Sequence, residues 1–311
     1  MKKSLLITTA LLALTVTACN NNNSKADYSS LSIISPTGAP ALGFYDFATS
    51  SNFVTNTDPT NIVAMMNAGQ KDVIVLPTNA GVNAIVNKNA PYKIAATITF
   101  GNFYVASLNN DDNGVMDAND TILLFQKNNV PDKLFHYVYG SDFDANIHYV
   151  TAVNDVATAV RDGYFLDAEG QRHTPNYVLT AEPSLTAMGS AVTTYANIQE
   201  KYREKSGDKE IFQASVFIKN TVEADKGEAL LSKLESDINA AIKDSDKLLA
   251  GMNKAEAPAT VFGVAPQMAA NVLKNGNGMG LGFKKAKDNK AGIDQFLTLF
   301  NISETDEGIY F

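Results

Sequence analysis

Cysteine and histidine are scarce in this chain of 311 residues, which narrows the chemistry open to it. Cys19 is the single cysteine, so no disulfide within the chain can stabilise the fold. The histidines are His136, His148 and His173, and no two have the short spacing of metal ligands on one helix. The sequence also has no G-x-S-x-G motif, phosphate-binding loop or clustered carboxylate pair. An enzyme is therefore the weaker functional hypothesis, and we expect no cofactor.

An excess of positive charge is missing as well. The chain has 25 Lys and Arg residues against 33 Asp and Glu residues, a formal net charge of −8. An acidic protein is repelled by phosphate backbones and by anionic lipid headgroups, so nucleic acid is not an expected partner. The charge does not argue against a small ligand. The chain is long enough for one large domain or two smaller ones with real cores.

The N-terminal hydrophobic run, residues 5–16, is too short and too rich in small residues to cross a membrane. It follows Lys2 and Lys3 and ends in Val-Thr-Ala-Cys at 16–19, which resembles the lipobox of bacterial lipoprotein signal peptides. The resemblance implies that 1–18 are a signal peptide and that Cys19 is lipidated. Residues 19–28 would then tether the protein to the extracytoplasmic face of the cell membrane. The alternative is an ordinary secretory signal whose cleavage site happens to precede a cysteine.

Strand, turn and helix signals alternate after the tether. Short apolar runs bounded by Pro, Gly, Asn or Asp predict strands, and apolar residues three or four apart predict helices. The predicted strands of the first block are 31–35, 52–55, 72–76 and 92–107, with helices beginning near 39, 58 and 78. Such alternation is typical of βαβ units in a parallel sheet.

A second block repeats this alternation, and a helical tail follows it. Its predicted strands are 121–125, 147–150, 177–180 and 212–219, with helices at 131–139 and 153–161 and a hairpin at 165–173. The tail carries one apolar stripe, formed by Leu230, Leu231, Leu234, Ile238, Ala241 and Ile242. Because the tail has no predicted strand, we expect it to pack on the first sheet.

The predicted fold class is α/β, with two doubly wound lobes joined by two hinge crossings. We expect the crossings near 102–104 and 215–217. Lobe 1 would comprise 29–103 and 216–311, and lobe 2 would comprise 104–215. In α/β sheets, ligands bind outside the carboxyl ends of the strands, which here means between the lobes.

Three motifs in this order carry a family resemblance: ISPTGAPAL at 34–42, VLPTNA at 75–80 and LTAEP at 179–183. Together they resemble the type II periplasmic binding proteins of importers, within the branch that binds nitrate, sulfonate and thiamine-pyrimidine precursors. The resemblance implies a monomeric solute-binding lipoprotein of an ABC importer. Its partners would be a small-molecule ligand, the importer permease and, through the lipid on Cys19, the membrane.

The resemblance also implies that three loops line the ligand site. Their residues are Thr37, Gly38 and Ala39; Thr78, Asn79 and Ala80; and Asn128, Asn129 and Val130. Each set lies at a predicted helix N-terminus, where unpaired backbone N–H groups favour anionic or carbonyl-bearing ligands. The alternative is that these residues simply cap their own helices.

Two further residues are candidates for the same site. Glu182 either accepts hydrogen bonds from a ligand or caps the helix that begins at Pro183. Phe103, at a predicted crossing, is a candidate stacking surface for a planar ligand. None of the three loops contains an obvious Lys or Arg, which favours a neutral or weakly anionic planar metabolite over nitrate or sulfonate. The alternatives are a cell-surface enzyme that uses Glu182 and an adhesive lipoprotein with an exposed apolar patch.

An acidic segment at 109–120 resembles a calcium-binding loop. Asn109, Asp111, Asn113, Asp117 and Asp120 fall at ligand positions, and Gly114 at the sharp turn. However, the last ligand is Asp rather than Glu, and the flanking segments are predicted strands. A solvated hairpin tip explains the same residues, so no metal site is expected.

Overall fold

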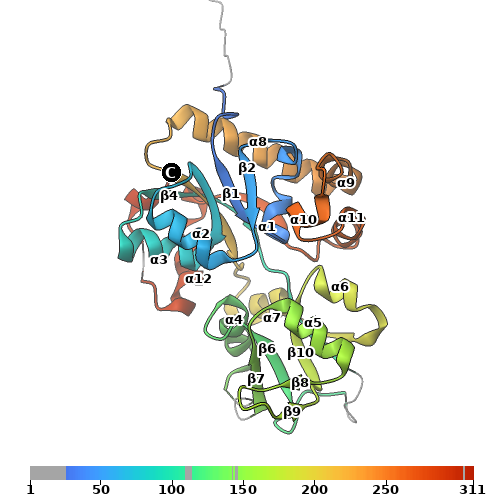
Figure 1. Cartoon of the computed structure of the whole chain (residues 1–311). Helices are drawn as coiled ribbons and strands as arrows, with labels where there is room; N and C mark the ends of the chain where they lie inside the picture. The colour runs from blue at the N-terminus through green and yellow to red at the C-terminus, as the bar shows by residue number, and fades with distance from the viewer. Residues whose placement is uncertain (1–25, 109–113, 142, 144–145, 304) are drawn as a thin grey trace, which may run out of the picture.

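The computed structural model describes residues 26–108, 114–141, 143, 146–303 and 305–311. The predicted signal peptide, Cys19 and most of the predicted tether lie outside the described residues. The described chain forms two lobes, which lie one above the other in Figure 1. One lobe is built on a six-stranded sheet and the other on a five-stranded sheet.

The larger lobe has the strand order β13-β4-β12-β3-β1-β2. Its strands are β1 (Ile33–Pro36), β2 (Phe53–Asn56), β3 (Val73–Pro77), β4 (Tyr92–Thr99), β12 (Ala214–Lys219) and β13 (Leu281–Lys285). Its helices are α1 (Ala39–Leu42), α2 (Pro59–Asn67), α3 (Thr78–Lys88), α8 (Ala224–Lys243), α9 (Ser245–Met252), α10 (Pro258–Phe262), α11 (Pro266–Lys274) and α12 (Lys290–Leu297). Short 3-10 helices are η1 (Tyr45–Phe47), η4 (Lys287–Asn289), η5 (Thr298–Phe300) and η6 (Glu307–Ile309).

The smaller lobe has the strand order β11-β5-β10-β6-β7. Its strands are β5 (Phe103–Ser107), β6 (Ile122–Phe125), β7 (Ile147–Val150), β10 (Tyr177–Ala181) and β11 (Thr193–Asn197). A separate hairpin pairs β8 (Phe165–Leu166) with β9 (Arg172–His173), as predicted for 165–173. The helices are α4 (Val130–Tyr139), α5 (Val153–Asp162), α6 (Ser184–Met188), the 3-10 helix η3 (Gly189–Ala191) and α7 (Ile198–Ser206).

Both sheets combine parallel strands with one inner strand that arrives from the other lobe. In the larger sheet β1 pairs in parallel with β2 and β3, whereas β12 runs antiparallel between β3 and β4. In the smaller sheet β6 pairs in parallel with β7 and β10, whereas β5 runs antiparallel between β10 and β11. The predicted α/β class with two lobes is confirmed.

The predicted continuous strand 92–107 is wrong at its centre. β4 ends at Thr99 and β5 begins at Phe103 in the other sheet, so residues 100–102 form the first crossing. Gly101 has a φ of 98°, a conformation that side chains disfavour but glycine adopts freely. The return crossing precedes Ala214, the first residue of β12. The proposed lobe boundaries at 103/104 and 215/216 stay predictions.

The expectation that the C-terminal tail contributes no strand is also wrong. β13 pairs antiparallel with β4 at the edge of the larger sheet. Its sequence, LGFKK, contains a glycine and two lysines and no β-branched residue, so local sequence does not predict a strand here. The strand forms because this segment pairs with β4. The sequence analysis also missed β11 and α7, at 193–206.

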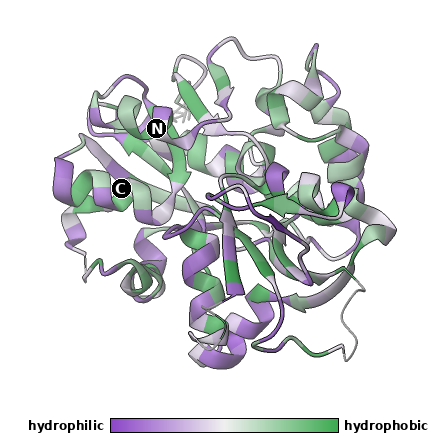
Figure 2. Ribbon diagram, turned by 60° about the horizontal axis from the view of Figure 1, so that its bottom comes forward, coloured by the Kyte–Doolittle hydropathy of each residue, from purple (hydrophilic) through white to green (hydrophobic). Residues whose placement is uncertain are grey.

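The apolar stripe predicted on the tail packs into the larger lobe through α8. Leu230, Leu231, Leu234, Ile238 and Ala241 are buried in its core, whereas Ile242 is 40% exposed and does not belong to the stripe. Figure 2 shows hydrophobic stretches along several sheet strands, whereas the outer helices carry both hydrophilic and hydrophobic residues. Across the described part of the chain, no helix has the length and apolar character needed to cross a membrane.

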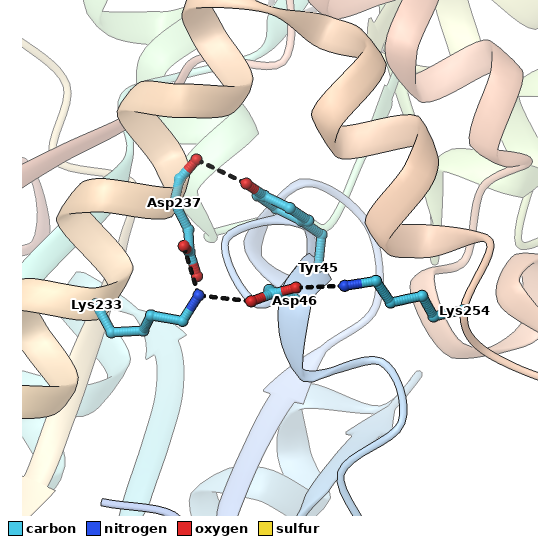
Figure 3. A network of polar contacts seen from close by, with 5 residues as sticks. All are labelled: Tyr45, Asp46, Lys233, Asp237 and Lys254. Carbon is cyan, nitrogen blue, oxygen red and sulfur yellow. Dashed lines mark hydrogen bonds and ion pairs between the residues drawn. The ribbon is translucent and has the colours of Figure 1, made fainter.

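An ion-pair network fastens α8 to η1 and to the end of α9 (Figure 3). Lys233 Nζ lies 2.5 Å from Asp46 Oδ2 and 2.7 Å from Asp237 Oδ1, and Lys254 Nζ lies 2.7 Å from Asp46 Oδ1. The Tyr45 hydroxyl donates a hydrogen bond to the backbone carbonyl of Asp237. Burial raises the pKa of Asp237, although the hydrogen bond from Lys233 opposes the change. Lys233 therefore holds two carboxylates together in a partly buried site.

We expect Lys233→Met to lower the free energy of unfolding by about 2 kcal/mol, because it leaves partly buried carboxylates without their shared cation. The cost is smaller than for a fully buried pair, since Lys254 and solvent still reach Asp46. Urea denaturation measures it. Lys201→Met is the matched control, because Lys201 forms an exposed pair with Glu204 and its loss should leave stability unchanged. Equal effects for the two variants would contradict the role given to Lys233.

Candidate functional site

Strand register places the carboxyl ends of both parallel sets where the lobes meet. Ala214, the first residue of β12, pairs with Pro77, the last residue of β3. In the smaller sheet Phe103, the first residue of β5, pairs with Ala181, the last residue of β10. Because β5 and β12 each begin at a crossing, the strands beside them end there (Figure 1). We call the loops after β1, β2, β3, β6, β7 and β10 the lobe junction.

The first predicted loop, Thr37 to Ala39, belongs to the lobe junction. Gly38 precedes α1 with a φ of 88°, and its N–H already donates to the carbonyl of Phe262 at 2.8 Å. Ala39 is buried, whereas Thr37 and Gly38 are partly exposed. A Cβ added at Gly263 would lie 2.8 Å from Thr37 Cβ, so the segment after α10 packs directly on this loop. Thr37 is the side chain of this set that remains open to a ligand.

In the second loop, Thr78 and Asn79 have different environments. Thr78 is fully buried, with its Oγ1 2.7 Å from Ser215 Oγ, which in turn lies 2.9 Å from Thr97 Oγ1. This hydroxyl chain joins β12 to its neighbours inside the sheet. Asn79 and Ala80 are partly exposed at the start of α3. Asn79 is therefore the stronger candidate for a ligand contact.

The third set lies at the start of α4 in the smaller lobe. Asn128 and Asn129 are exposed, and Val130 is buried in the lobe's core. The backbone N–H of Asn128 donates to Asp132 Oδ2 at 2.6 Å. The other carboxylate oxygen of Asp132 accepts from the Tyr149 hydroxyl at 2.8 Å. Asp132 thus holds the loop, and the side chains of the two asparagines face solvent.

A hollow of about 330 Å³ lies beside this loop. Its lining includes Lys127, Asn128, Lys133, His136 and Tyr149. Lys127 Nζ lies 5.0 Å from the centroid of the Tyr149 ring. The expectation that the loops contain no cation rested on residues 128–130. The loop between β6 and α4 begins earlier and includes Lys127, so a positive charge is present at this edge of the junction.

Glu182 and Phe103 each have a protein partner. The Glu182 carboxylate accepts from the backbone N–H and the hydroxyl of Thr186, in the first turn of α6, at 3.1 and 2.9 Å. Phe103 is buried, and its ring centroid lies 6.0 Å from that of Phe125 inside the smaller lobe. Its environment favours a core role over stacking on a ligand.

The glycine-rich segment before β13 contacts both the first crossing and the smaller lobe. The sequence does not predict these contacts. The Tyr104 hydroxyl donates to the carbonyl of Gly278 at 3.2 Å, and a Cβ at Gly278 would lie 3.2 Å from Glu182 Cγ. Phe100 N donates to the carbonyl of Gly280 at 2.8 Å. Burial, followed by the charge of Glu182, raises the pKa of Tyr104 to about 12, so its hydroxyl stays protonated as a donor.

Four buried polar atoms near the two crossings have no hydrogen-bond partner within the described chain. They are Asn79 Oδ1, Thr99 Oγ1, Thr180 Oγ1 and Gln213 Oε1. Gln213 N donates to the carbonyl of Thr99, and Thr78 N donates to that of Gln213, so three of them lie on neighbouring segments. Buried polar atoms are normally paired, so an unpaired one calls for an explanation such as a bound water, an ion or a functional role. The junction is therefore the strongest candidate site.

The acidic segment 109–120 is only partly described. Asn109, Asp111 and Asn113 lie outside the described residues, so the calcium-loop reading stays untested. Asp120 is buried, and its Oδ2 accepts from the backbone N–H of Asp117 at 2.7 Å.

A second hollow, of about 240 Å³, lies at the amino end of β1 beside Asp46 and Lys233, away from the junction.

No protein-family model and no curated protein matches the sequence. An ABC transporter structure from Parabacteroides distasonis matches with a TM-score of 0.68 and 16% identity, over 86% of this chain and 91% of that chain. The periplasmic aliphatic sulphonate binding protein SsuA from Escherichia coli matches with a TM-score of 0.64 and 10% identity, over 90% and 91%. The alkanesulfonate-binding protein SsuA from Xanthomonas axonopodis pv. citri, bound to MOPS, matches with a TM-score of 0.57 and 11% identity, over 88% and 94%.

These identities are low, so the likeness concerns the fold. Both sheets place an antiparallel strand from the other lobe beside a parallel set, and the chain crosses twice between them. The similar structures cover nearly the whole described chain. The chain therefore has the type II periplasmic binding protein fold.

Proposed function

We propose that this protein is the extracytoplasmic solute-binding component of an ABC importer and binds a small molecule between its lobes. The observation that carries the proposal is the set of unpaired buried polar atoms at the lobe junction. The N-termini of α3 and α4 lie at the same junction and add backbone donors. The similar structures include an ABC transporter and a periplasmic aliphatic sulphonate binding protein, and this likeness favours import over the enzyme and adhesive alternatives.

The ligand we propose is a small neutral or weakly anionic metabolite that both donates and accepts hydrogen bonds. Asn79 and Gln213, which are partly exposed, offer carbonyl oxygens to a donor on the ligand, whereas Thr99 and Thr180 are fully buried. Lys127 and Lys133, beside Asn128, supply positive charge for a weakly anionic group. Since Phe103 packs on Phe125, little supports the planar shape that the sequence suggested.

The remaining part of the proposal is a lipid anchor on Cys19. Tyr28, near the start of the described chain, lies with Leu31 and Ile33 beside the hollow at the amino end of β1. That end of the sheet is opposite to the lobe junction. A tether attached there would leave the junction free for a solute and for the permease.

We expect one class of solute to raise the melting temperature in proportion to the logarithm of its concentration. The measurement is a thermal-shift screen, in which neutral and anionic metabolites are tested as two separate groups. Asn79→Ala should raise the Kd about five- to tenfold, the value of one hydrogen bond of about 1 kcal/mol. Asn87→Ala, at the exposed end of the same helix, is the control and should leave the Kd unchanged. If no solute stabilises the protein, or if both variants bind equally, the proposed site is wrong.

A separate prediction concerns the anchor. In its native host, the protein should sediment with membranes and carry the added mass of a lipid at Cys19. Cys19→Ser should move it to the soluble extracytoplasmic fraction, because acyl chains contribute about 0.8 kcal/mol of membrane affinity per buried methylene. Ser24→Ala should change neither result. A soluble, unmodified parent protein would instead indicate an ordinary secretory signal.

A further inference from the structure

Two histidines that are far apart in the sequence lie together at the outer edge of the smaller lobe. His148 is on β7, the edge strand of the sheet, and His173 is on β9 of the separate hairpin. Their ring centroids are 4.2 Å apart. Asp167, in the hairpin loop, points one carboxylate oxygen at His173, with 2.7 Å between Oδ2 and Nε2. The three side chains form a cluster that spacing along the sequence does not reveal.

The geometry of the cluster suits a single cation. One potential ligand atom from each of the three residues lies within 4.8 Å of the others. Zinc binds imidazole nitrogen and carboxylate oxygen at about 2.0–2.2 Å, which puts tetrahedral ligands about 3.3 Å apart. Side-chain rotations that shorten the longest of these separations by up to about 1.5 Å would bring these atoms to that spacing. In the described part of the chain, no other group of His, Cys, Asp and Glu residues meets this condition.

The hairpin holds Asp167 in place for this role. Asp167 Oδ1 accepts from the backbone N–H groups of Glu169 and Gln171, at 3.0 and 2.7 Å, which leaves Oδ2 directed at the histidines. The Phe165 ring contacts both imidazoles, with centroid distances of 5.1 Å to His148 and 5.4 Å to His173. The apolar ring limits the rotation of the histidines on one side. Preorganised ligands of this kind are typical of metal sites.

A hydrogen-bonded pair explains Asp167 and His173, but it does not explain His148. The His148 ring lies 4.2 Å from the His173 ring, and two protonated imidazoles at this distance would repel each other. A shared cation accounts for all three positions at once.

We propose that His148, Asp167 and His173 bind a divalent transition cation of the zinc class. Two imidazoles and one carboxylate select such a cation over Ca²⁺ or Mg²⁺, which prefer ligand sets made of oxygen. Three protein ligands leave a fourth position for water. The cation would fasten the β8–β9 hairpin to β7. The β8–β9 hairpin precedes β10 and lies at the end of the smaller lobe that faces away from the junction, so this site is separate from the solute site (Figure 1).

The test is a titration of the purified chain with Zn²⁺ by calorimetry and with Co²⁺ by visible absorption. Cys19→Ser is the background, so no thiolate contributes, and excess Ca²⁺ occupies any site in the acidic segment 109–120. We expect one cation per chain, the absorption of a four-coordinate Co²⁺ site, and a higher melting temperature with Zn²⁺ than with a chelator. Absence of Zn²⁺ binding in this background would overturn the proposal.

The variants separate the cluster from other surface ligands. His148→Ala and His173→Ala should each weaken Zn²⁺ binding by more than about tenfold, because a lost ligand costs at least as much as a lost outer-shell partner. His136→Ala removes the histidine outside the cluster and should bind like the parent. The melting temperature measured with chelator shows whether each variant folds. Where an alanine variant does not fold, His173→Gln takes its place. Binding that survives both cluster variants, or that falls equally in His136→Ala, would refute the assignment.

Discussion

Replacing Gly280 with alanine is expected to lower the free energy of unfolding by about 3 kcal/mol or more. An ideal Cβ at this position would lie 2.0 Å from the carbonyl oxygen of Gly101, far inside contact distance. Gly280 also has a φ of 60°, which costs an alanine about 1–2 kcal/mol by itself. The Gly101 backbone cannot easily retreat, because Phe100 beside it is hydrogen-bonded to Gly280 and the chain is crossing between lobes. Urea or thermal denaturation measures the loss.

Gly276→Ala is the matched control for this prediction. Gly276 lies in the same segment with a φ of 103°, but a Cβ there meets no atom within 4 Å. It therefore carries the backbone strain without the close approach to the crossing. We expect Gly280→Ala to be the more destabilising of the two by at least about 1 kcal/mol. If the two substitutions cost the same, the close packing of this segment on the crossing is not what requires glycine at 280.

Gly81→Ala is the second substitution with a large expected effect, of about 2–3 kcal/mol of unfolding free energy. Gly81 lies in α3, and an added Cβ would lie 2.1 Å from Cζ of Phe217 on β12. Phe217 is fully buried in the centre of the sheet, so its ring has no free space to enter. Alanine is the better helix former by about 1 kcal/mol, but the overlap outweighs that gain. Chemical denaturation checks the sign and size.

A double-mutant cycle tests the cause. In a Phe217→Leu background the ring is gone, and we expect Gly81→Ala to cost less than about 1 kcal/mol there. Val86→Ala, an exposed position on the same helix, is the control and should leave stability unchanged or slightly higher. A cost for Gly81→Ala that is independent of residue 217 would show that the contact with Phe217 is not responsible.

Local patterns of the sequence determined the fold class. Apolar runs such as 73–76 became fully buried strands, because a strand between two layers of helices must be apolar on both faces. The stripe of Leu230, Leu231, Leu234 and Ile238 became the buried face of α8, because apolar residues three or four apart lie on one side of a helix. Helix-start signals at Thr78 and Val130 matched α3 and α4. Strand β13 was not predicted, because an edge strand can form without a continuous apolar run.

The tertiary structure decided what the individual site residues do. Thr78 reads as a ligand-facing cap, but long-range pairing of β3 with β12 places Ser215 on its hydroxyl. Phe103 reads as a stacking surface, but β5 turns it towards Phe125. Lys127 and the pair His148 and His173 gained their proposed roles from neighbours brought close by the fold. Periodicity depends on contacts a few residues apart and is visible in one sequence. A site depends on register between distant strands, which folding alone establishes.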